Sequence, residues 1–142
     1  MDLDVSRPVH IVVAEDNPVL AQLLALQLGH DGYRVTCIAD GQELIERIAG
    51  LSPSLLLLDL GLPTLDGFEV LSMLGRERPD QAPSLPFPVV VISGRISDES
   101  VEDAARLGAA ETLFKPYDYN HLIEVITRSL HEPRRYEPVI GC

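Results

Sequence analysis

A run of four leucines that ends in a carboxylate constrains the fold of this chain more than any other feature. Residues 55–58 are apolar at every position, which predicts a strand buried on both faces, as in a parallel sheet covered on both sides. The run stops at Asp59, and a loop rich in glycine and proline follows it. A charge costs little there if the end of the strand opens into a polar crevice, which is where open α/β sheets bind ligands. The sequence therefore directs attention to Asp59 and the residues that meet it.

Apolar residues along the rest of the chain alternate between short continuous runs and helix-like spacing. The runs predict strands at residues 9–14, 33–38, 54–58, 89–92 and 111–114. The spacing predicts helices with apolar stripes at Leu20, Leu23, Leu24 and Leu28; at Leu44, Ile45 and Ile48; at Val70, Leu71 and Leu74; at Val101, Ala104, Ala105 and Gly108; and at Leu122, Ile123, Ile126 and Leu130. A strand and a helix thus alternate five times, which predicts an α/β fold: a five-stranded parallel sheet, doubly wound, with helices on both faces.

Local signals set the expected ends of these elements. Asn17 is expected to cap the first helix, because its side chain can accept from free amides and Pro18 has no amide to satisfy. Ser97 and Asp118 are the expected caps of the fourth and fifth helices. The connection at residues 79–88 carries four prolines and is largely polar, so we expect a surface loop.

Composition and charge exclude several classes of function. The chain has 142 residues, which suits one domain with a full core. It carries 22 acidic against 11 basic side chains, a net charge of −11 that repels nucleic acid and anionic membranes, so we expect neither direct nucleic-acid binding nor membrane insertion. The N-terminus lacks a signal-peptide pattern, no apolar run reaches the ~20 residues that span a bilayer, and two cysteines provide no disulfide framework. We therefore expect a reduced, cytoplasmic setting.

Chemically active side chains follow four of the predicted strands. Glu15 and Asp16 follow the first strand, Asp59 the third, Ser93 the fourth and Lys115 the fifth. In a doubly wound sheet whose order reverses between the first and third strands, these ends surround one crevice. The strand order itself is not readable from the residues, so the convergence depends on that topology.

The residue types at these positions favour phosphoryl chemistry. Three carboxylates within a few ångströms cannot all stay ionised unaided, because their repulsion raises at least one pKa. A hard divalent cation resolves the repulsion, and an all-oxygen site with room for water suits Mg²⁺. An added ammonium and hydroxyl make a place for a phosphoryl group, with Asp59 as the nucleophile that forms an acyl phosphate.

The chain resembles the receiver domain of response regulators over residues 8–131. The resemblance rests on residues 11–18 (IVVAEDNP), 55–67 (LLLLDLGLPTLDG), 89–94 (VVVISG) and 113–116 (LFKP), in that order and at those spacings. It implies the flavodoxin-like strand order 2-1-3-4-5. Residues 1–7 are then an N-terminal extension and residues 132–142 a C-terminal tail. These are too short for an output domain, so we expect a stand-alone regulator, with a receiver excised from a larger regulator or hybrid kinase as the alternative.

The resemblance also implies what the acidic residues do. Asp59 would accept a phosphoryl group from a phosphohistidine on a histidine kinase or a histidine phosphotransfer protein. Glu15, Asp16 and Asp59 would hold Mg²⁺ together with the backbone carbonyl of Gly61. A downstream protein partner would then read the phosphorylated state.

One departure from the family pattern concerns the readout. Ser93 would bond the phosphoryl group and Lys115 would contact it, aimed by a cis peptide bond before Pro116. The family usually has an aromatic residue three positions before the lysine, and here that position is Thr112. The nearest aromatic is Phe114. Phosphorylation chemistry is unaffected, whereas the usual aromatic readout through the fourth helix and fifth strand is put in doubt. The resemblance also allows a homodimer through the face of the fourth helix, fifth strand and fifth helix.

Two other classes of function remain as alternatives. A phosphatase similar to the haloacid dehalogenases also forms an aspartyl phosphate, but it carries a second Asp two residues after the nucleophile. Here that position is Gly61, so the general acid is missing. The other alternative is an unphosphorylated interaction module with a decayed site, which the complete acidic pair and Lys115 disfavour and Thr112 keeps open.

Overall fold

The computed structural model describes residues 8–75, 85–94 and 98–131, in which five parallel strands form one sheet of order β2-β1-β3-β4-β5. The strands are β1 (His10–Ala14), β2 (Arg34–Ile38), β3 (Leu55–Asp59), β4 (Val89–Ser93) and β5 (Glu111–Phe114). The helices are α1 (Pro18–His30), α2 (Gly41–Leu51), α3 (Gly67–Leu74), α4 (Asp98–Arg106) and α5 (Tyr119–His131). The predicted doubly wound fold and its strand order are confirmed.

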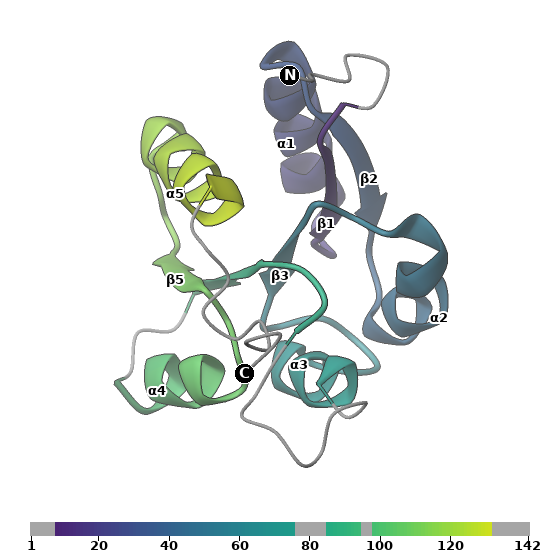
Figure 1. Ribbon diagram of the computed structural model, residues 1–142, viewed down its shortest axis with the longest axis vertical. Coiled ribbons are helices and arrows are strands. Elements are labelled where there is room, and N and C mark those ends of the chain that lie inside the picture. The colour runs from purple at the N-terminus through teal and green to yellow at the C-terminus, as the bar shows by residue number, and fades with distance from the viewer. Residues whose placement is uncertain (1–7, 76–84, 95–97, 132–142) are drawn as a thin grey trace, which may run out of the picture.

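Helices cover both faces of this sheet (Figure 1). α1 and α5 lie on one face, while α2, α3 and α4 lie on the other. Side chains along each strand alternate between the two layers, because successive residues of a strand point to opposite faces. Leu56 and Leu58 of β3 join the cluster under α2 and α3, whereas Leu55 and Leu57 join the cluster under α1 and α5. All four leucines are fully buried, so the prediction of a strand covered on both faces is confirmed.

Caps fix the helix starts much as the sequence predicts. Asn17 Oδ1 accepts from the amides of Val19 and Leu20 at the start of α1. Asp118 caps α5, because its Oδ1 accepts from the amide of Asn120 at 3.4 Å while its backbone oxygen accepts from the amide of Leu122 at 3.0 Å. The expected cap at Ser97 lies outside the described residues.

The expected apolar stripe of α1 is wrong at one position. Leu24 and Leu28 are buried against the sheet, but Leu23 is 48% exposed. Neighbouring helical residues are about 100° apart around the axis, and the buried stripe of α1 runs along Ala21, Leu24 and Leu28, so Leu23 lies beside that stripe and not within it. Ala105 of α4 is exposed beside buried Ala104 for the same reason.

The proline-rich connection is not a surface loop throughout. Residues 79–84 lie outside the described residues. Leu85 and Phe87, however, are buried in the cluster under α2 and α3, and the carbonyl of Pro88 accepts from the amide of Leu56. The end of the connection therefore belongs to the core, and the surface-loop expectation is wrong there.

Candidate functional site

The strand order brings the predicted residues to one end of the sheet. Asp59 is the last residue of β3 and Ser93 the last residue of β4, while Lys115 follows β5 directly. Glu15 and Asp16 follow β1, the strand that separates β2 from β3. Since all five strands are parallel, their carboxyl ends share an edge, and the order reverses at β1 and β3. The predicted convergence is confirmed as a matter of geometry.

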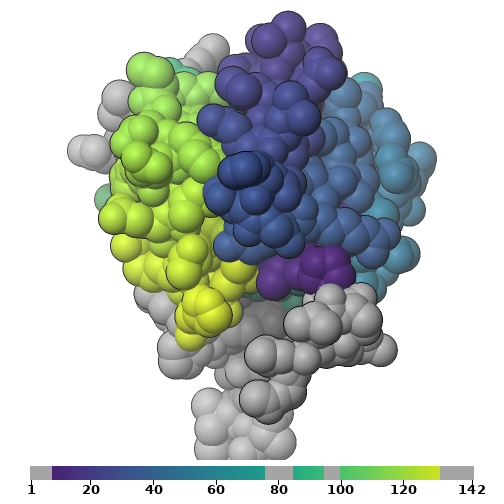
Figure 2. All heavy atoms as spheres, turned by 90° about the horizontal axis from the view of Figure 1, so that it is seen from above, coloured from purple at the N-terminus to yellow at the C-terminus, as the bar shows by residue number. Residues whose placement is uncertain are grey.

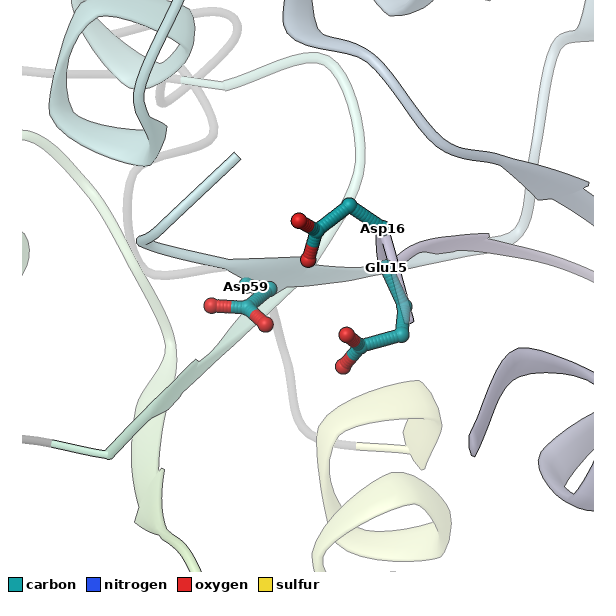
Figure 3. A group of neighbouring side chains, drawn as sticks. All are labelled: Glu15, Asp16 and Asp59. Atoms are coloured by element: carbon teal, nitrogen blue, oxygen red, sulfur yellow. The ribbon is translucent and has the colours of Figure 1, made fainter. Parts of the chain in front are cut away.

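The three carboxylates face a common space at this edge (Figure 3). Glu15, Asp16 and Asp59 each offer one oxygen, and these atoms lie within 4.8 Å of one another. Glu15 and Asp59 are buried, whereas Asp16 is exposed and forms the solvent side of the group. Three carboxylates this close, with one open side, are a donor set that suits a hard divalent cation keeping several waters.

Lys115 neutralises the two buried members of the group. Its Nζ donates to Asp59 Oδ2 at 2.8 Å and to Glu15 Oε1 at 3.2 Å. The Lys115–Pro116 peptide bond is cis, as the resemblance implied. The backbone amide of Lys115 also donates to the carbonyl of Ser93 at 2.8 Å, which ties the end of β5 to the end of β4.

Backbone amides hold the remaining oxygens of the same two carboxylates. The amide of Gly61 donates to Asp59 Oδ1 at 2.8 Å, and the amide of Asn17 donates to Glu15 Oε2 at 3.0 Å. Each buried carboxylate therefore has one oxygen on an amide and the other on Lys115. Such pairing offsets the cost of burying the charges and fixes the direction of both groups.

The electrostatics of the site follow from this burial. Burial raises the pKa of Glu15, and the charge of Asp59 adds to the rise against the opposing Asn17 amide and Lys115. Burial alone would lower the pKa of Lys115, but its bonds to Asp59 and Glu15 outweigh that effect and raise it. Lys115 is thus held as a cation. A bound divalent cation would relieve the remaining repulsion among the acids.

Ser93 and Thr112 lie on the neighbouring strands of this edge. Ser93 is buried at the end of β4 and is the register partner of Phe114. Thr112 is half-buried in the middle of β5, where it pairs with Val91. The aromatic residue beside Ser93 in the sheet is therefore Phe114, and Thr112 lies two residues further from the strand end.

A groove beside the site escaped prediction. It has a volume of about 540 Å³ and runs from the strand ends to the outer side of α1. Its lining comprises Leu20, Leu23, Leu24, Gln27, Gly94, Lys115, Pro116, Tyr117, Asp118 and Tyr119. Figure 2 looks onto the face where α1 (blue) lies beside α5 (yellow-green). The available signal was the excess of leucines in α1 over what one buried stripe requires.

Tyr117 connects this groove to the acidic group. Its ring packs against the cluster under α1 and α5, and burial raises the pKa of its hydroxyl. The charges of Glu15 and Asp59 raise this pKa further, against the opposing charge of Lys115.

Among the helices of the described residues, none is long and apolar enough to cross a membrane.

Comparisons with known proteins agree with this geometry. The model of the response regulator receiver domain family matches residues 11–127. Among curated proteins, the nitrogen assimilation regulatory protein NtrX of Azorhizobium caulinodans is 32% identical, over 87% of this chain and 26% of its own. The transcriptional regulatory protein FixJ of Bradyrhizobium diazoefficiens is 28% identical, over 87% of this chain and 57% of its own. The chain thus spans between a quarter and somewhat over half the length of these two relatives.

Solved receiver domains have the same fold. The BeF3-activated N-terminal receiver domain of RstA from Klebsiella pneumoniae is 28% identical with a TM-score of 0.75, covering 87% of this chain and 99% of that one. The receiver domain of the Francisella response regulator 1452 is 26% identical with a TM-score of 0.73, covering 85% and 95%. With the family match spanning most of the sequence, the chain belongs to the response regulator receiver domain family of two-component signalling.

Proposed function

We propose that this receiver domain is switched by phosphorylation of Asp59. The observation that carries the proposal is the buried carboxylate of Asp59, bonded to Lys115 Nζ at 2.8 Å beside two further acids. In the reaction, an Asp59 oxygen forms a bond to phosphorus while the phosphorus–nitrogen bond of a donor phosphohistidine breaks. The electron pair of that bond stays on the imidazole. Lys115 neutralises charge on the phosphoryl oxygens and Ser93 donates its hydroxyl to one of them.

We further propose that the reaction depends on Mg²⁺. Glu15, Asp16 and Asp59 would hold the ion together with the carbonyl of Gly61, because their oxygens form the acidic group described above. When bound, the ion supplies positive charge to the transferring phosphoryl group. The chain's own part is to orient Asp59 through the Gly61 amide and to keep Lys115 protonated.

The switch would act through the end of β4. Phosphate on Asp59 would draw the Ser93 hydroxyl inward, and the bond from the Lys115 amide to the Ser93 carbonyl would carry that movement to β5. The face of α4, β5 and α5 would then present a changed surface to a downstream protein or a second copy. Thr112 lies on this face where the family has a ring, so we expect a readout without an aromatic swing at that position.

We propose that the donor protein docks on α1. The groove joins the outer side of α1 to Lys115, so a partner that fills it also reaches the phosphoacceptor. Val19, Leu23 and Leu26 are exposed at helical spacing, and α1 carries no Asp, Glu, Lys or Arg. An uncharged apolar stripe suits the helical surface of a histidine kinase or histidine phosphotransfer protein.

The decisive experiment is intact mass after incubation with acetyl phosphate, with and without Mg²⁺. We expect a phosphoryl adduct that requires Mg²⁺ on the parent protein and none on Asp59→Asn, which keeps the size of the side chain but removes the nucleophile. If no adduct forms, binding of beryllofluoride separates rapid hydrolysis from a pocket without phosphoryl affinity. Failure of both reactions contradicts the proposal and favours an interaction module with a decayed site.

The donor surface has its own test. The double variant Val19→Ser and Leu26→Ser changes two exposed positions of α1. We expect it to react with acetyl phosphate as the parent does, but to accept phosphate from a phosphohistidine protein about tenfold more slowly, because apolar contact with the donor is lost. Equal transfer rates from the protein donor would contradict docking on α1.

A further inference from the structure

Thr64, in the loop between β3 and α3, has a backbone conformation that threonine rarely adopts. Its φ is 67°, in the left-handed region where a β-branched residue is strained. Strain of this kind persists only where surrounding contacts enforce it. Thr64 is exposed, so packing of its side chain in the core does not enforce it. The contacts that do so come from the start of α2.

The hydroxyl of Thr64 joins this loop to the N-terminal end of α2. Thr64 Oγ1 donates to Asp40 Oδ1 at 3.0 Å and accepts from the amide of Gln42 at 3.0 Å. The carbonyl of Pro63 accepts from the amide of Gly41, also at 3.0 Å. Gly41 and Gln42 are the first two residues of α2, and amides at that position have no partner within a helix. The loop between β3 and α3 satisfies both of them.

Close packing of the loop on α2 requires glycine at one position. A Cβ at Gly41 would collide with the carbonyl of Leu65, the residue after Thr64. Leu62, two residues before Thr64, is buried in the cluster under α2 and α3. Apolar neighbours thus hold the loop against the protein on both sides of Thr64, and the hydroxyl of Thr64 adds the polar contacts that fix it to the helix.

The same loop carries Gly61 at the edge of the acidic site. The amide of Gly61 donates to Asp59 Oδ1 at 2.8 Å, and its carbonyl is the proposed backbone ligand of Mg²⁺. Only Leu62 and Pro63 separate Gly61 from Thr64. Mg²⁺ demands near-ideal octahedral geometry, so a small displacement of one ligand weakens its binding. The path of the loop between β3 and the start of α2 therefore decides how well the Gly61 carbonyl fits the ion.

We propose that Thr64 is a positioning residue for the ion site, because its hydroxyl holds the loop on α2 and thereby fixes the carbonyl of Gly61 where Mg²⁺ binds. The inference rests on the proposed Mg²⁺ site. It has a reciprocal consequence, since two coupled sites strengthen each other by the same factor. Bound Mg²⁺ strengthens the contacts between the loop and the first turn of α2. The N-terminal end of α2 is then a second region, besides the face of α4, β5 and α5, that responds to the state of the site.

The first test is the affinity for Mg²⁺, measured by isothermal titration calorimetry without a phosphodonor. Thr64→Val keeps the branched shape of the side chain and removes the hydroxyl, whereas Thr64→Ser keeps the hydroxyl. We expect Thr64→Val to raise the Kd for Mg²⁺ roughly threefold to tenfold, the effect of losing hydrogen bonds of ordinary strength. Thr64→Ser should bind within about twofold of the parent. Thr64→Gly, which tolerates a positive φ and also lacks the hydroxyl, replaces the valine variant if that variant does not fold.

Hydrogen exchange measures the reciprocal effect. In the parent, Mg²⁺ should slow the exchange of the Gly41 and Gln42 amides by about threefold or more, because these amides exchange through local opening at the start of α2. In Thr64→Val the same addition should have a clearly smaller effect. The amide of Ser52 is an internal control, because it lies at the opposite end of α2, where it donates to the carbonyl of Ile48.

Ile48→Val provides the matched control for general destabilisation of α2. Ile48 is buried at the end of the helix that lies away from the loop, so this variant should be less stable but should keep the Kd of the parent. A Kd of folded Thr64→Val equal to that of the parent would overturn the inference while leaving the ion site in place. Weakening of Thr64→Ser by as much as Thr64→Val would overturn it as well. A parent that binds no Mg²⁺ would contradict the proposed ion site, and this inference with it.

Discussion

At the scale of single residues, Lys115 has two roles that are separable in principle. It is placed to meet a phosphoryl group, and it is already the counter-ion of two buried carboxylates, Asp59 and Glu15. A buried carboxylate without a counter-ion destabilises the folded state, because it has lost its hydration and gains no ion pair in return. Lys115 therefore contributes to stability before any ligand arrives.

Replacing this lysine tests that contribution. Lys115→Met should lower the free energy of unfolding by about 1–3 kcal/mol at pH 7 in the presence of EDTA, because Asp59 and Glu15 lose their shared cation. Mg²⁺ should restore part of the loss, since the ion supplies the missing positive charge. Urea denaturation with and without Mg²⁺ measures both effects. Lys115→Arg, which keeps the charge, serves as the control, and a methionine variant as stable as the parent in EDTA would refute this role.

Much of this site is predictable from sequence because it consists of strand ends. A long apolar run that stops at a carboxylate, as at Asp59, locates both the strand and the edge where its last side chain lies. The amides that hold Asp59 and Glu15 are not predictable in this way, because any residue type supplies an amide and only the loop path aims it. Tyr117 also escaped prediction, because it lies between β5 and α5, where no strand or helix periodicity indicates which way a side chain points.

At the scale of elements, α1 shows where reasoning from periodicity fails. The buried face of an amphipathic helix can be recognised in the sequence because it is apolar while the opposite face is polar, as in α2 and α5. α1 is apolar on its outer side as well, so Leu23 and Leu24 look equivalent in the sequence although only Leu24 is buried. The exposed apolar residues of α1 support the docking surface proposed above, because contiguous apolar patches on a protein surface often mark contact sites.

Two adjacent leucines of α1 make a matched pair for measuring this difference. Leu24→Ala should destabilise the protein by about 2–4 kcal/mol, because it opens a cavity against the sheet. Leu23→Ala should change the stability by less than about 0.5 kcal/mol, because the side chain is half in solvent and alanine favours the helix. Thermal or urea unfolding of both variants gives the comparison. Equal destabilisation would mean that Leu23 also belongs to the core.

At the scale of the whole molecule, charge is the dominant feature. The chain has a net charge of −11 on 142 residues. Its acidic side chains repel one another more strongly in the folded state, because folding brings them closer together. The three acids at the strand ends intensify that repulsion locally, and Lys115 offsets only part of it. Stability should therefore depend on the ions in solution.

Salt provides the corresponding measurement. Raising NaCl from about 10 mM to about 200 mM should raise Tm by roughly 2–4 °C, because the Debye length shortens and the carboxylates repel one another less. The same titration on Asp59→Asn separates two causes of the rise in Tm. General screening of charge gives the same rise in the variant, whereas binding of cations at the strand ends gives a smaller rise, because one of the three carboxylates is gone. A Tm that stays constant or falls over this range would contradict repulsion as the limiting factor.

The acidic group joins residues that the chain keeps far apart. Lys115 is 56 positions from Asp59 and 100 positions from Glu15, and each follows or ends a different strand. An unfinished chain, such as one still emerging from the ribosome without β5, has the carboxylates but lacks the cation that orients them. The proposed phosphorylation of Asp59 therefore requires a chain that has folded at least as far as Lys115, directly after β5.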